Sequence, residues 1–154
     1  MQIDTLRFGV TEIDEERIIQ FTAGIPPFAE VRRFAVVARE EELPFQWLQA
    51  VDDPALAFVV VDPRIFFPAY APQIAPADRE ELGLDPEEAV QVLVLLVLGR
   101  TPRSITANLL APVVISPRTR TAKQVVLEGG LDRVRVPLPL PQVVEAVPAA
   151  EAAG

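Results

Sequence analysis

Short apolar runs separated by proline, glycine and aspartate limit the folds open to this chain more than any other property. Sixteen prolines are spread along 154 residues, and proline interrupts a helix or a central strand because it lacks a backbone N–H. Runs rich in valine, isoleucine and aromatic residues between such breaks are typical of strands. We expect strands at residues 2–8, 17–21, 34–38, 45–51, 57–61, 90–98, 105–115 and 120–128, with a last short one at 133–136.

This spacing of strands predicts a mainly all-β fold. Eight or nine short strands within residues 1–136 favour a small, closed or partly open β-barrel. Residues 92–98 read Val-Leu-Val-Leu-Leu-Val-Leu, a pattern typical of a strand that is covered on both faces or lines a barrel. Because Pro112 removes a ladder hydrogen bond from the run at 105–115, we expect it at an edge or a bulge.

A short helical insertion is expected near residues 76–90. Pro76 stands where a first helical residue would be, and Gly83 follows a natural end. A second start signal is Asp85-Pro86-Glu87-Glu88, in which Asp85 can cap the helix and Glu88 can close a capping box. Residues 137–154 are rich in proline and alanine, so we predict a poorly ordered tail that follows a single domain at 1–136.

Two missing residue types exclude much chemistry. The chain has no histidine and no cysteine, which excludes thiol nucleophiles, thiolate–metal sites and imidazole bases. It also lacks a glycine-rich phosphate motif, so we expect no cofactor and no metal. The N-terminus does not read as a signal peptide, and no apolar run reaches the roughly 20 residues of a membrane helix. We therefore expect a cytoplasmic protein without a membrane role.

The charge is unevenly distributed along the chain. Residues 1–100 carry a net charge of −10 and residues 101–154 a net charge of +2. An acidic body repels phosphate backbones, so direct nucleic-acid binding is not expected. It suits a basic protein partner, although net charge of this size also serves solubility alone.

Three aspartates beside turns allow two interpretations. Asp52, Asp53 and Asp62 could act as paired carboxylates, which would make the protein a carboxylate-dependent hydrolase on a β scaffold. Asp before proline also caps turns with its own side chain, and their spacing matches no metal-binding loop, so turn capping is the favoured reading. A barrel that holds a small ligand is a third possibility, which a filled interior would exclude.

The segment Phe66-Phe67-Pro68-Ala69-Tyr70 is the most suggestive local feature. Adjacent residues of an extended chain point to opposite sides, so one phenylalanine can pack inward while the other is free to anchor a partner. That both are core residues is an equal alternative. Trp47 is expected in the core. Lys123, the sole lysine, is expected to make a surface contact.

Four stretches together resemble the FliW family of bacterial flagellar assembly factors. They are residues 21–28 (FTAGIPPF), residues 44–58 (PFQWLQAVDDPALAF), Asp62-Pro63 with FFPAY at 66–70, and TANLLAP at 106–112 running on to KQVVL at 123–127. Their order and spacing hold over residues 1–130, whereas the tail lies outside the pattern. The connection at 99–103 is shorter than is usual for the family.

The resemblance implies a non-catalytic, β-barrel-like protein that binds flagellin in the cytoplasm. It also implies binding to CsrA, a small basic RNA-binding dimer that represses flagellin translation, so that export of flagellin frees the protein to capture CsrA. The motifs do not say which residues make contact. We expect the binding surface at Phe66, Phe67 and Tyr70, with Asp52, Asp53 and Asp62 shaping the adjacent turns, and Asn108 and Lys123 as further contacts.

Overall fold

The computed structural model describes residues 1–101 and 104–139. Its strands are β1 (Gln2–Thr5), β2 (Gly9–Glu12), β3 (Ile19–Phe21), β4 (Arg33–Val37), β5 (Gln46–Ala50), β6 (Ala57–Val61), β7 (Gln91–Val97), β8 (Thr106–Ala107), β9 (Val113–Ile115), β10 (Thr121–Gln124) and β11 (Val136–Pro137). The helix α1 spans Pro76–Glu81, and short 3-10 turns are η1 (Glu15–Arg17), η2 (Glu40–Glu42), η3 (Pro63–Ile65) and η5 (Leu131–Arg133).

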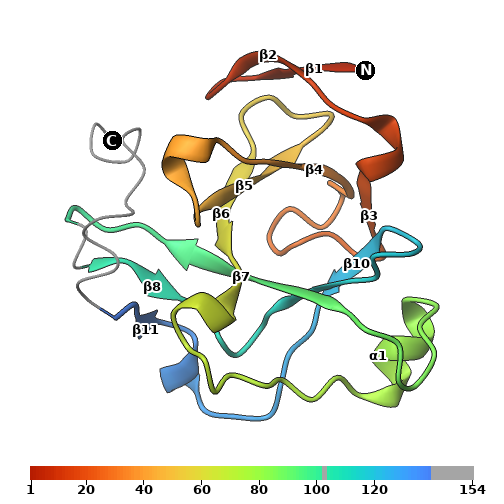
Figure 1. Ribbon diagram of the computed structural model, residues 1–154, viewed down its shortest axis with the longest axis vertical. Coiled ribbons are helices and arrows are strands. Elements are labelled where there is room, and N and C mark those ends of the chain that lie inside the picture. The colour runs from red at the N-terminus through yellow and green to blue at the C-terminus, as the bar shows by residue number, and fades with distance from the viewer. Residues whose placement is uncertain (102–103, 140–154) are drawn as a thin grey trace.

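Seven of these strands close into a barrel, which confirms the predicted fold class. They follow the order β7-β6-β5-β4-β3-β10-β9, and β9 pairs again with β7. Every pair in the ring is antiparallel except β10 with β3, which is parallel. Figure 1 shows the ring, with the loop between β3 and β4 curling across it.

The strand β7 closes the ring because its two halves have different neighbours. Gln91–Leu93 pair with β9, whereas Val94 and Leu95 pair with β6. Its last residues, Leu96 and Val97, pair with β8 outside the ring. Closure leaves none of the seven strands as a free edge along its whole length.

Apolar side chains fill the interior of the barrel. Each of the seven strands contributes to this cluster, and the β3–β4 loop adds Ile25. Its buried members are Ile19, Phe21, Ile25, Phe34, Leu48, Ala50, Leu56, Val60, Leu93, Val113, Ile115 and Ala122. An interior filled in this way excludes the interpretation of a small-ligand barrel.

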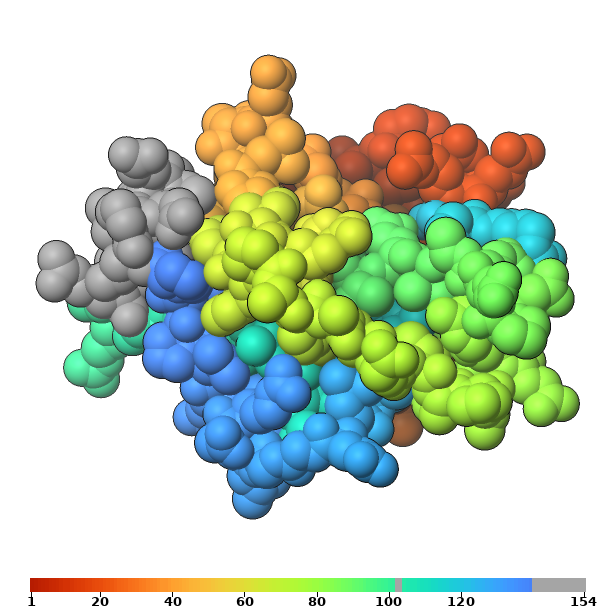
Figure 2. Space-filling model, turned by 60° about the horizontal axis from the view of Figure 1, so that its bottom comes forward, coloured from red at the N-terminus to blue at the C-terminus, as the bar shows by residue number. Residues whose placement is uncertain are grey.

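A second cluster lies on the outer face of β5, β6 and β7. Alternation along the strands sends Trp47, Val59 and Val94 outward, opposite to Leu48, Val60 and Leu93. This face is covered by the segment from η3 to α1 and by the strands β8 and β11. Figure 2 shows the segment from η3 to α1 crossing the molecular surface. Burial of both faces explains why residues 92–97 of β7 are all apolar.

The structure differs from the sequence prediction at residues 105–115. The expected single strand is two strands, β8 and β9, joined by a turn in which the Asn108 Oδ1 accepts from the Ala111 N–H at 3.1 Å. Pro112 lies just before β9, where its carbonyl accepts from the Val125 N–H at 2.9 Å. The interruption at Pro112 is thus a strand end.

The sequence prediction also missed the strand β2, which pairs with β1 in a hairpin.

The helical insertion is shorter than expected. The helix α1 ends before Gly83, whose φ of +70° is in the region that favours glycine. The predicted second helix at Asp85 is a turn, although the capping-box contact forms, with the Asp85 N–H donating to the Glu88 carboxylate at 3.2 Å.

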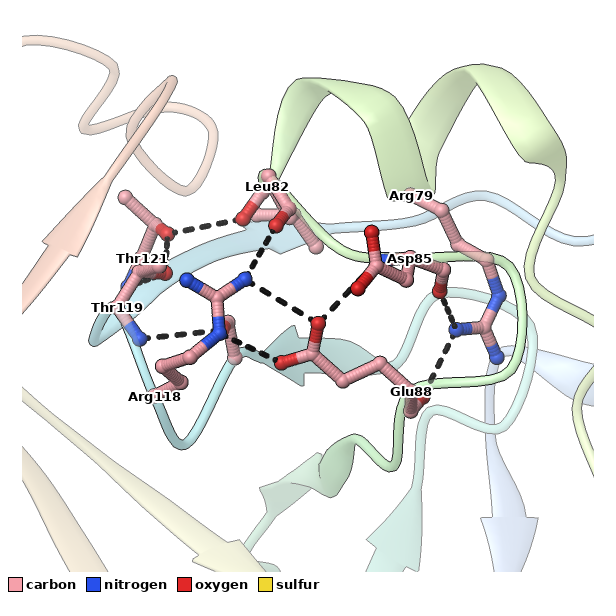
Figure 3. Close-up of polar contacts among 9 residues, drawn as sticks. Arg79, Leu82, Asp85, Glu88, Arg118, Thr119 and Thr121 are labelled. Carbon is pink, nitrogen blue, oxygen red and sulfur yellow. Dashed lines mark hydrogen bonds and ion pairs between the residues drawn. The ribbon is translucent and has the colours of Figure 1, made fainter.

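Two arginines hold this turn in place of a helix. The Arg118 Nε donates to the Glu88 Oε2 at 3.0 Å and its Nη2 to the Gly83 carbonyl at 2.7 Å. The Arg79 Nη1 donates to the carbonyls of Asp85 at 3.3 Å and Glu88 at 2.9 Å. Figure 3 shows both arginines converging on the turn. Donors from outside the segment satisfy the carbonyls that a helix would have paired internally.

The packed part of the chain continues past residue 136. The strand β11 pairs with β8, and Leu138 is buried, with its N–H donating to the Ile105 carbonyl at 3.1 Å. The predicted domain end therefore falls inside β11. Residues 140–154, which make up most of the predicted tail, lie outside the described residues.

We predict that Leu93→Ala lowers the free energy of unfolding by about 2–5 kcal/mol, because it opens a cavity inside the barrel at the closing strand. The matched control is Val97→Ala on the same strand, since Val97 is 50% exposed and Leu93 is 3% exposed. Urea unfolding should show a change of about 1 kcal/mol or less for the control. Equal losses for the two variants would contradict closure of the barrel through β7.

Candidate partner-binding surface

The three predicted aspartates hold turns and do not form a pair. Asp52 and Asp53 lie in the β5–β6 turn, whereas Asp62 lies at the opposite end of β6. Asp53 accepts from the Ala55 N–H at 3.1 Å, and Asp62 accepts from the Arg64 N–H at 3.0 Å. The structure therefore assigns capping roles to Asp53 and Asp62, and the hydrolase interpretation loses the carboxylate pair on which it rests.

Asp52 is held by an arginine at the start of β4. The Arg33 Nη2 and Nε donate to the two carboxylate oxygens of Asp52 at 2.6 and 3.0 Å. This two-pronged hydrogen bond lowers the pKa of Asp52. Among the described residues, no group of three acidic side chains is placed to hold a metal ion.

Phe66 and Tyr70 are core residues, which corrects the expected surface anchor. The Phe66 ring packs beside Phe45, with 6.0 Å between ring centroids. The buried Tyr70 hydroxyl donates to the Leu109 carbonyl at 2.7 Å. Phe67 is partly buried against the same outer cluster. These aromatic rings point inward because the outer face of β5–β7 is apolar and must be covered.

A groove lies beside this segment and was not anticipated from the sequence. One wall is the extended chain that follows Tyr70, and the other is the chain that follows β10. Its volume is about 760 Å³, and Figure 2 shows the hollow between the two segments. We call it the Tyr70 groove; it is lined by residues 69–76, Asp78, residues 125–128 and Arg133.

Both walls of the Tyr70 groove carry unpaired backbone groups. The N–H groups of Val125 and Leu127 donate to the carbonyls of Pro112 and Leu110 at 2.9 and 2.8 Å. Val126, between them, presents its backbone to the other side and makes no hydrogen bond within residues 1–101 and 104–139. The same holds for the backbone of residues 71–74 in the opposite wall. Val126 is also 75% exposed, so the groove wall presents an apolar side chain to solvent.

An ion-pair network closes one end of the Tyr70 groove. The Lys123 Nζ lies 2.7 Å from the Asp78 Oδ1 and 3.1 Å from the Glu81 Oε2, and Glu81 also accepts from the Thr22 hydroxyl. Asp78 and Glu81 raise the pKa of Lys123, and the hydrogen bonds from Thr22 and Lys123 lower that of Glu81. Lys123 thus joins β10 to α1, which is a structural role.

Arg133 also lines the Tyr70 groove, where it brings a positive charge close to Tyr70. Its guanidinium lies 5.9 Å from the centroid of the Tyr70 ring. Burial raises the pKa of Tyr70 to about 12. Of the eight residues predicted for the surface, only Tyr70 lines the groove, and Lys123 reaches it through Asp78. Asn108 supports the β8–β9 turn.

The chain matches a family model described as FliW protein over residues 2–138. It is 38% identical over 138 residues to the flagellar assembly factor FliW of Bacillus subtilis, which covers 90% of this chain and 96% of the relative. The identity is 41% over 135 residues for the factor from Syntrophus aciditrophicus, with coverage of 88% and 85%.

A solved structure agrees with the fold. It is described as a crystal structure of the flagellar assembly factor FliW, and it aligns with a TM-score of 0.78 and 35% identity over 89% of this chain and 94% of that chain. Within the described residues, no helix has the length and apolar character needed to cross a membrane.

We predict that Tyr70, the sole tyrosine, titrates at about pH 12 in the folded protein instead of near 10. The folded state holds the phenolic proton more tightly, so this group stabilises the fold below about pH 10, and the contribution is lost as pH rises toward about 12. Tyrosinate absorbance in the near ultraviolet measures the midpoint. A midpoint near 10 in the folded protein would show that Tyr70 is not buried.

Tyr70→Phe should lower the free energy of unfolding by about 1–3 kcal/mol, because the Leu109 carbonyl loses its donor.

Proposed function

This chain belongs to the FliW family, and on that premise we propose that it is a non-catalytic flagellar assembly factor that binds flagellin and a CsrA-type regulator. In this proposal the two partners compete for the protein in the cytoplasm. Flagellin occupies it until flagellin is exported, and the freed protein then captures the regulator and relieves repression of flagellin translation. The similarity of the chain to flagellar assembly factors of bacteria supports the role in assembly.

The observation that carries a binding role is the Tyr70 groove. Two extended segments line it with backbone groups that have no partner among the described residues. An extended segment of another protein can pair with such backbone by strand addition, which supplies affinity without a catalytic group. Use of the same groove by both partners would make their binding mutually exclusive, as partner switching requires.

Charge favours a basic partner at one end of the barrel. The acidic turns η1 and η2 lie where β3 begins and β4 ends, and four of their glutamates are exposed: Glu15, Glu16, Glu40 and Glu41. Acidic surface of this kind accelerates encounter with a basic dimer through long-range attraction. The acidic surface accelerates encounter with flagellin only to the extent that the contact surface of flagellin is also basic.

We predict that Val126→Glu weakens binding to flagellin and to the CsrA-type regulator at least about tenfold, because a charge replaces an exposed apolar side chain in the wall of the Tyr70 groove. Isothermal titration calorimetry against each purified partner measures the change. Val10→Glu is the matched control, since Val10 is 65% exposed on β2, away from the groove. Failure of the unsubstituted protein to bind either partner at micromolar concentration would refute the proposed function; an equal effect of both substitutions would refute only the location.

We predict that affinity for the CsrA-type regulator falls as salt rises from about 0.05 to 0.5 M, because ions screen the acidic turns. The association rate should carry most of the change. Neutralising Glu15 and Glu16 to glutamine should reduce this salt dependence. Stopped-flow association at several salt concentrations tests it, and a rate that is flat across the series would contradict electrostatic steering.

A further inference from the structure

A second pocket lies at the end of the barrel where β4 ends and β5, β7 and β10 begin. Its volume is about 510 Å³, and none of its lining residues is shared with the Tyr70 groove. Its lining comprises residues 11–14, Arg17, residues 35–38, Gln46, Gln91 and Arg120. Mouths of β-barrels are frequent positions for ligand sites because several strands bring side chains together there. We call it the mouth pocket.

Two glutamines place amide groups at this mouth. Gln46 stands two residues before Leu48, and Gln91 stands two residues before Leu93. Because side chains of a strand alternate between faces, each glutamine points to the same side as a leucine of the barrel interior. Neither glutamine side chain makes a hydrogen bond within the described ranges. Both amides are therefore available to a ligand.

Arg120 brings a positive charge to the pocket and forms no ion pair among the described residues. Its Nη2 donates to the Arg17 carbonyl at 3.1 Å, while its Nε is enclosed and has no acceptor. Neither Arg120 nor Arg17 forms an ion pair with a carboxylate in residues 1–101 and 104–139. Burial, followed by the nearby Arg17 guanidinium, lowers the pKa of Arg120. Burial of a cation is unfavourable where a donor lacks an acceptor, as at the Arg120 Nε.

The acidic residues in the lining make their contacts with groups other than Arg120. The Glu12 carboxylate pairs with the N-terminal ammonium of Met1 at 2.8 Å. Asp14 caps η1 by accepting from the Glu16 N–H at 2.9 Å. Both carboxylates thus have other partners while keeping their negative charge, and the Arg120 Nη1 retains donors for an acceptor from outside.

The backbone at Arg120 is unusual for a residue with a side chain. Its φ of 59° lies in the left-handed region that glycine tolerates best. Hydrogen bonds hold it there: its N–H donates to the Ser116 carbonyl, and its carbonyl accepts from the Gln20 N–H, both at 2.9 Å. An arginine at a position suited to glycine indicates that its side chain has a use, since non-glycine residues held in this region cluster at functional sites.

From this arrangement we infer that the mouth pocket is a carboxylate-binding site in which Arg120 pairs with the anion and Gln46 and Gln91 bind the polar group next to it. A planar carboxylate fits the guanidinium, and side-chain amides complement a peptide group. The ligand is a C-terminal carboxylate of a peptide or an acidic side chain, which share this chemistry. This site shares no lining residue with the Tyr70 groove, and it lies at the barrel end that carries the acidic turns η1 and η2.

The test uses the full chain and two-dimensional NMR that detects backbone amides, glutamine side chains and arginine Nε–H groups. The probes are N-acetyl-alanyl-alanine with a free carboxylate, its C-terminal amide, and acetate as the side-chain mimic. We expect saturable shifts of the Arg120 Nε–H and of the Gln46 and Gln91 side-chain amides with the free acid only. Tighter binding of the peptide than of acetate identifies a C-terminus as the source, and equal binding identifies a lone carboxylate.

The decisive variant is Arg120→Gly, which removes the guanidinium and suits the left-handed backbone, so folding should be preserved. It should weaken binding about ten- to hundredfold. Arg32→Gln, which removes a positive charge at the opposite end of the barrel, is the control and should bind as the unsubstituted chain does. Equal binding of acid and amide, shifts spread over all arginines, or unchanged binding by Arg120→Gly would overturn the inference.

Discussion

Closure of the barrel through β7 is the constraint on which the rest of the structure depends. This strand pairs with β9 through its first half and with β6 through its second half. A strand shared in this way must supply backbone partners on both edges, and it must bury side chains on both faces. The unbroken apolar run at residues 92–98 meets both demands, because Leu93 enters the barrel while Val94 and Leu96 pack outside it.

The outer face of β5–β7 determines what the following segments do. Trp47, Val59 and Val94 need cover, and the segment after β6 provides it by turning Phe66 and Tyr70 inward. Aromatic burial of this kind outweighs any benefit of leaving the rings on the surface. The chain beyond Tyr70 is then drawn across the molecule with its backbone unpaired, so that the Tyr70 groove is a consequence of how the core is covered.

The fold separates two surfaces with different chemistry. The Tyr70 groove offers backbone hydrogen bonds and an exposed valine, which suits recognition of an extended segment with little dependence on its sequence. The mouth pocket offers a guanidinium and two amides, which suits a single polar group. Both lie outside the filled interior, in keeping with a protein that works by contact at its surface and not by enclosing a substrate.

Much of the fold could be predicted from local patterns, because strand runs and turn residues are local properties. The strands at residues 34–38, 45–51 and 57–61 were placed within one or two residues, and Asp62 was recognised as a turn cap. The Asp85 signal was misread since its outcome depends on Arg79 in the preceding helix and on Arg118, which comes from a distant part of the chain. The FliW resemblance was likewise carried by residues in order along the sequence.

Which side chains reach the surface was decided by the tertiary structure alone. Alternation along a strand defines two faces but does not say what covers each one, so the sequence left Phe66 and Phe67 undecided between core and surface and placed Tyr70 on the binding surface. The unpaired backbone at Val126 and the unpaired Nε of Arg120 depend on pairings between distant segments. The sequence by itself determined most of the barrel strands, the aspartate turns and the acidic balance. Only the closed barrel determined which backbone groups and donors remained without partners among the described residues, because pairing is a property of the whole ring.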